Sequence, residues 1–149
     1  MLFNLAPLFR QLFISFSCLP VVIAHLCTAP LGTQMIKHYY VSGALCQQYP
    51  CRNGVPDGMV KEFFEDGTPA SKCFFSAGKR EGPCMIYYRG GKTARVIYFK
   101  DNQKKWMRQY YQTGIIQEET WYRNSGTARQ KLYDASGKLK VDRDIPNAS

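Results

Sequence analysis

An aromatic doublet followed closely by glycine recurs along this 149-residue chain and constrains its fold more than any other feature. The first members of successive doublets lie 24, 24 and 23 residues apart (63−39, 87−63 and 110−87), and an altered copy, Leu132-Tyr133, begins 22 residues later. The four doublets are Tyr39-Tyr40, Phe63-Phe64, Tyr87-Tyr88 and Tyr110-Tyr111. Internal repetition at such a period indicates an array of stacked supersecondary units.

A second aromatic doublet follows the first by 11 residues in three of the copies, as at Phe74-Phe75, Tyr98-Phe99 and Trp121-Tyr122. Two short aromatic runs separated by a glycine turn are typical of a β-hairpin. We therefore predict an all-β fold for residues 33–140, an elongated, twisted antiparallel meander of repeated hairpins. Because neighbouring side chains of a strand point to opposite faces, each doublet is expected to place one ring on each face of the sheet.

Two segments carry a resemblance to a known repeat. Residues Lys61 to Gly67 read K-x-F-F-x-x-G, and residues Phe74 to Gly82 read F-F-x-x-G-K-x-x-G. They resemble the bacterial MORN-variant repeat, the unit of the YwqK-type antitoxin repeat family, over roughly residues 36 to 140. The resemblance implies a non-catalytic repeat protein, with an antitoxin as one version. The wider MORN class implies a second function, docking on a membrane surface.

Some positions depart from the repeat. Asn102 stands where the pattern calls for a turn glycine, and the fifth copy lacks a recognisable second strand. Residues 141–149 are polar and include Pro146, and we expect them to form a disordered tail.

The first 32 residues differ in composition from the rest of the chain. Residues 12–29 carry no formal charge at neutral pH, and Arg10 precedes them. A short apolar run behind a basic flank is typical of a signal peptide or membrane anchor, and we predict an N-terminal hydrophobic helix of this kind in residues 1–32. The predicted location is therefore the periplasm or cell envelope of a bacterium. The alternative is an N-terminal helix packed on the sheet.

Four cysteines lie beyond this leader. Cys73 and Cys84 flank the Gly78–Gly82 turn symmetrically, and a cross-strand pair brings Cα atoms within disulfide range, so we predict a bridge between them. Cys46 and Cys51 are expected on opposite faces of one strand. The alternative is that all four thiols simply fill apolar positions.

Positive charge is concentrated between Lys79 and Arg108, where nine basic residues face only two acids, in a chain of net charge +9. Such a field favours anionic partners, although exposed strand lysines also protect sheet edges from aggregation. Aromatic rings beside cations are typical of membrane interfaces and protein hot spots. The predicted binding residues are Lys79, Arg80, Arg89, Lys92, Arg95, Lys104, Lys105, Trp106, Arg108, Tyr110 and Trp121.

Signals for catalysis are thin. The two histidines are His25 in the leader and His38, and no phosphate loop, nucleophile elbow or HExxH motif is present. The cysteine spacings lack the short pairs of a zinc site, and we expect no cofactor or metal. We predict a scaffold that binds a protein, with a toxin as one candidate partner. The alternative is docking on acidic phospholipids through residues 79–108, and we do not expect nucleic acid as a partner.

Overall fold

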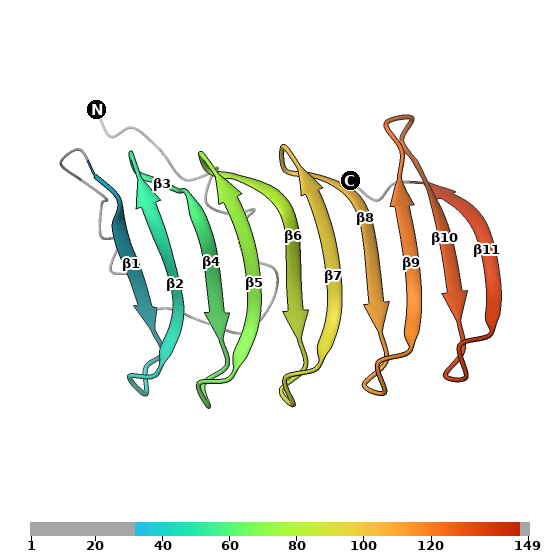
Figure 1. The fold of residues 1–149 in the computed structure, drawn as a ribbon, viewed down its shortest axis with the longest axis horizontal. Helices are drawn as coiled ribbons and strands as arrows, with labels where there is room; N and C mark the ends of the chain where they lie inside the picture. The colour runs from blue at the N-terminus through green and yellow to red at the C-terminus, as the bar shows by residue number, and fades with distance from the viewer. Residues whose placement is uncertain (1–31, 147–149) are drawn as a thin grey trace.

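The computed structural model describes residues 32–146, which form a single antiparallel sheet of 11 strands (Figure 1). Strands neighbour one another in chain order, except that β3 pairs beside β4 onto β2. The predicted all-β antiparallel meander is thereby confirmed, while the predicted N-terminal helix lies outside the described residues. The strands are β1 (Gln34–Tyr39), β2 (Leu45–Arg52), β3 (Val55–Pro56), β4 (Gly58–Phe63), β5 (Pro69–Ser76), β6 (Lys79–Tyr87), β7 (Thr93–Lys100), β8 (Gln103–Tyr110), β9 (Ile116–Tyr122), β10 (Thr127–Tyr133) and β11 (Leu139–Pro146).

The turns at one end of the sheet begin in the aromatic doublets. In the third copy, the Gly91 N–H donates to the Tyr88 carbonyl and the Tyr88 N–H donates to the Lys92 carbonyl, both at 2.8 Å. Gly91 has a φ of 79°, and the β6–β7 register shifts by one residue after Ile86. This is a tight turn closed by a glycine bulge. The same hydrogen bonds recur at 40–44, 64–68, 111–115 and 134–138, which explains the regular spacing of the glycines.

At the opposite end of the sheet, the β5–β6 turn and the β7–β8 turn each contain two residues with positive φ. One is Ala77-Gly78, with φ values of 46° and 79°, and the other is Asp101-Asn102, with 50° and 65°. Such pairs suit the right-handed twist of a hairpin, and asparagine tolerates this conformation better than most residues. Asn102 can therefore replace the expected glycine without breaking the repeat.

One face of the sheet, called the core face below, carries the most deeply buried side chains. Register places Cys84 between Cys73 and Ile97, and Phe99 follows two residues after Ile97 on the same face. Cys84, Ile97 and Phe99 form a buried cluster. The structure joins Cys73 to Cys84 by a disulfide across a Cα–Cα distance of 4.0 Å.

Polar side chains continue the core face toward the doublet turns and satisfy one another. Glu62 accepts hydrogen bonds from Gln47 at 3.2 Å and from Ser71 at 2.6 Å. Further along, Glu118 accepts from Thr120 at 2.8 Å and from Gln130 at 2.9 Å. Because half-buried polar groups need partners, this ladder stabilises a face that no second layer of the described chain covers.

The C-terminal strand corrects two expectations. The fifth copy has a second strand, β11, which pairs with β10 from Thr127↔Pro146 to Tyr133↔Leu139. Residues 141–146, expected to be a disordered tail, belong to this strand, because β10 offers them a full ladder of backbone partners. Residues 147–149 lie outside the described residues. Within residues 32–146, no helix is long and apolar enough to cross a membrane.

Candidate protein-binding surface

The face opposite the core face displays large apolar side chains to solvent. We call it the aromatic face and define it by Met59, Phe74, Pro83, Tyr98, Trp106 and Trp121. Met59 pairs with Phe74, and register aligns Pro83, Tyr98, Trp106 and Trp121 in one row across β6 to β9. Met59, Phe74 and Trp121 are 38%, 41% and 37% exposed. The half-buried Tyr98 and Trp106 lie on the same face. Exposed apolar side chains gathered on one face mark an interaction surface rather than scattered surface residues.

The row is organised around two tryptophans. Trp106 and Trp121 are cross-strand partners, and the Tyr98 and Trp106 rings stack with centroids 5.9 Å apart and planes 10° from parallel. An open hollow of about 280 Å³ lies here, lined by Trp106, Met107, Arg108 and Trp121. Rings held by neighbours form an anchor that loses little conformational freedom when a partner binds.

A second row on the aromatic face supplies positive charge. Register runs without a break through Lys61, Lys72, Met85, Val96, Arg108, Glu119 and Lys131. Lys131 lies over the Trp121 ring at 5.6 Å, and Lys72 lies over the Tyr87 ring at 5.8 Å. The half-buried Met85 and Val96 stand at the middle of this row, and lysines stand at its two ends.

Arg108 and Glu119 form an ion pair within this row. The Arg108 Nε lies 2.7 Å from Glu119 Oε1, and the guanidinium lies over the Trp106 ring at 5.6 Å. The hydroxyl of Tyr133 donates to Glu119 Oε2 at 2.8 Å, and this bond to the carboxylate raises the pKa of Tyr133. The pair thus fixes the guanidinium beside the tryptophan hollow.

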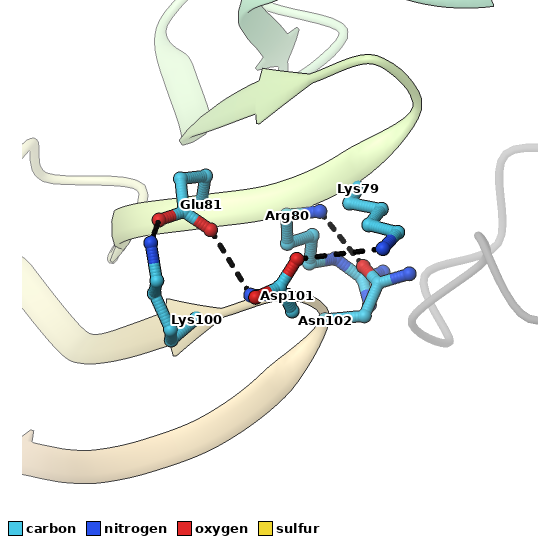
Figure 2. A network of polar contacts seen from close by, with 6 residues as sticks. All are labelled: Lys79, Arg80, Glu81, Lys100, Asp101 and Asn102. Carbon is cyan, nitrogen blue, oxygen red and sulfur yellow. Dashed lines mark hydrogen bonds and ion pairs between the residues drawn. The ribbon is translucent and has the colours of Figure 1, made fainter.

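Several residues of the predicted basic segment instead form ion pairs at the β7–β8 turn (Figure 2). Lys79 approaches Asp101 at 3.4 Å, and Lys100 donates to Glu81 at 2.5 Å. The Asp101 N–H also donates to Glu81, at 3.0 Å. This backbone bond and the bond from Lys100 lower the pKa of Glu81. The Lys100–Glu81 bond also raises the pKa of Lys100. The network ties the β7–β8 turn to the start of β6 and leaves these charges partly neutralised.

Other predicted site residues lie on the core face. The Arg80 guanidinium lies over the rings of Phe75 and Phe99, at 5.8 and 5.3 Å, and burial lowers its pKa. Arg95 donates to Gln109 at 2.6 Å, and Lys104 lies 5.9 Å over the Tyr122 ring. These cations face away from the aromatic row.

The remaining predicted residues lie at turns or strand ends. Arg89 pairs with Asp66 at 3.6 Å and lies over the Phe64 ring at 4.9 Å. Lys92 donates to a backbone carbonyl at 3.0 Å. Lys105 contacts Gln103 and Asn124, and Tyr110 accepts a bond through its carbonyl. Of the predicted set, the structure therefore brings together only Trp106, Arg108 and Trp121.

The predicted binding residues did not include the rest of the aromatic face, which is Met59, Phe74, Pro83 and Tyr98, although the repeat spacing links these positions. The positions 59, 83 and 106 are equivalent in successive copies, as are 74, 98 and 121. The residue types at these equivalent positions differ, so they form a less visible pattern in the sequence than the doublets or the run of basic residues. Lys61 and Lys72 lie outside the 79–108 window and were missed for that reason.

No group of metal-ligating side chains exists among residues 32–146. The arrangement is that of a single-sheet repeat protein with an exposed apolar surface, and residues 56–77 match the family described as MORN repeat variant. A chain in the crystal structure of accessory secretory protein 1, 2 and 3 in Streptococcus pneumoniae aligns with a TM-score of 0.41 and 18% identity. The alignment covers 64% of this chain and 18% of that one. Comparison with curated proteins gave no match.

Proposed function

We propose that this protein is a non-catalytic scaffold that binds another protein through its aromatic face. The exposed Met59, Phe74 and Trp121 on this face carry the proposal, because water-exposed apolar side chains gathered on one face favour a covering partner. The stacked Tyr98–Trp106 pair resembles the rigid aromatic anchors of protein interfaces. A toxin is one candidate partner by resemblance to the antitoxin repeat family.

The same proposal places the protein in the bacterial cell envelope, exported or anchored. The Cys73–Cys84 disulfide supports an oxidising compartment, since such bonds rarely persist in reducing cytosol. Intact mass of the protein from its native host, before and after thiol alkylation, tests both points. A chain with two alkylatable thiols at positions 73 and 84 would contradict the proposed location.

Binding of acidic phospholipid through residues 79–108 is the weaker reading. Lys79, Lys100 and Arg108 already have carboxylate partners, and Arg80 is turned to the core face. Lipid docking would weaken steeply with salt, whereas a largely apolar protein contact would persist.

Photo-crosslinking tests the proposal. A benzophenone amino acid replaces Trp121 in one version and the exposed turn residue Val41 in the other, and each is expressed in the host. We expect discrete protein adducts from position 121 that survive high salt and are absent from position 41. Equal adducts at both positions, or flotation with anionic vesicles at low salt only, would overturn it.

A further inference from the structure

We infer that the partner segment carries a large apolar side chain flanked by carboxylates, with the apolar group seated between Trp106 and Trp121. This inference rests on the proposed function and adds the chemistry of the partner to it. It follows from the shape of the hollow, from the positions of the cations and from one fixed acid.

The hollow is large enough to receive a large apolar side chain. Its volume of about 280 Å³ accommodates a single aromatic or large aliphatic group, and two indoles form its walls. A ring or branched aliphatic group placed there contacts Trp106 and Trp121 at once, beside the Arg108 side chain. Desolvated aromatic contacts of this kind dominate the binding energy of interfaces.

Lysines lie on both sides of the hollow, with Lys131 on the strand next to that of Trp121 and Lys72 three strands from Trp106. Lys61 and Lys72 are direct cross-strand neighbours on β4 and β5, and Lys131 lies on β10. With strands about 4.8 Å apart, Lys72 and Lys131 are separated by roughly 24 Å, about seven residues of extended chain. Carboxylates at both ends of a short segment would therefore meet a cation at each end.

Glu119 argues for a protein rather than an anionic membrane. Its carboxylate lies on the aromatic face beside the hollow, held by Arg108 and the Tyr133 hydroxyl. Glu119 is buried and neutralises Arg108, so the positive charge of this row is left at its separated lysines rather than spread as a continuous cationic surface. A peptide can place two spaced acids over Lys72 and Lys131, which a uniform sheet of lipid phosphates does not match as closely.

Selection from a displayed library of random 20-residue peptides tests the inference, using the full chain as bait. We expect enriched peptides that combine acidic residues with an aromatic or large aliphatic residue. Their binding should fall by at least about tenfold with Trp121→Ala and with Lys72→Glu. Lys138→Glu, the same charge change at the exposed β10–β11 turn, is the matched control and should bind like the wild type.

The remaining outcomes separate the inference from the proposed function. Enriched peptides that require Trp121 but are neutral or basic would overturn the acidic partner and leave protein binding intact. Peptides indifferent to Trp121→Ala and Lys72→Glu would overturn both, provided circular dichroism shows that the variants are folded. Displacement of enriched peptides by phosphatidylglycerol vesicles, with flotation of the protein, would assign the surface to lipid and also overturn the inference.

Discussion

The hydroxyl of Tyr88 donates a 2.7 Å hydrogen bond to the backbone carbonyl of Tyr110, 22 residues further along the chain. The second member of one doublet thereby holds the first member of the next. Tyr40 makes the equivalent bond to Phe63, and Tyr111 makes it to Tyr133. The structure thereby corrects the fifth copy by one residue, because its turn begins after Tyr133, which takes the first position of the pair in place of Leu132. In the second copy this position is Phe64, which has no hydroxyl, and its ring contacts Arg89 instead.

Removing or adding this hydroxyl should change stability in opposite directions. We expect Tyr88→Phe to lower the free energy of unfolding by about 1 kcal/mol, because the Tyr110 carbonyl loses a partly buried partner. We expect Phe64→Tyr to raise it by about 0.5 to 1 kcal/mol through a new bond to the Tyr87 carbonyl. Urea denaturation measures both, with Tyr39→Phe on the exposed side as a control without effect. A destabilised Phe64→Tyr would show that the added hydroxyl does not reach the Tyr87 carbonyl.

The β5–β6 turn offers a second stabilising change. Ala77 has a φ of 46°, a conformation that a Cβ disfavours and that asparagine accepts more readily. Ala77→Asn would produce the Asn-Gly pair that already forms the β2–β3 turn at Asn53-Gly54. We expect a gain of about 0.5 to 1 kcal/mol in unfolding free energy. Ala77→Val should lose stability, and a gain from Val would contradict the turn geometry.

The Glu81 network should make the protein sensitive to acid. The Asp101 N–H and the Lys100 ammonium lower the folded-state pKa of Glu81 below its unfolded value. The folded state therefore binds fewer protons, and the stabilisation is present above the unfolded pKa and lost as pH falls through the folded pKa. Thermal melts across pH should show a smaller acid-induced loss in Glu81→Gln. Parallel curves for variant and wild type would refute the linkage.

The disulfide should contribute more than any single polar contact. Cys73 and Cys84 are 11 residues apart in sequence, and closing a loop of that length restricts the unfolded chain. We expect reduction to lower the free energy of unfolding by about 3 kcal/mol. The double variant with serine at both positions should be equally destabilised and insensitive to reductant. A wild type whose stability does not respond to a strong reductant would speak against the bond.

The repeat itself was predictable, because each doublet marks the end of a strand and each following glycine marks its turn. The aromatic row was not, since it depends on which residues face one another across strands rather than on residue type at one position. Met59 and Trp106 occupy equivalent places yet share no chemistry beyond being apolar.

The basic segment shows why a charge count in sequence can mislead. Arg80 and Arg108 belong to one run, but the alternation of side chains sends them to opposite faces, and Lys79 ends at a turn. Strand β11 was missed for a different reason: the position 11 residues after Leu132-Tyr133 holds Arg143-Asp144 rather than an aromatic doublet, although the β11 backbone pairs with β10 along its whole length.

The hydrogen bonds from Tyr40, Tyr88 and Tyr111 each reach only the adjoining copy. Inserting or deleting one copy would consequently leave every remaining tie intact and alter the array by two strands, about 10 Å. The length of the sheet can therefore change in steps of one repeat, as gene duplication would add them. A protein with fewer or more copies would then offer a shorter or longer binding face to its ligand, with the same contacts within each repeat.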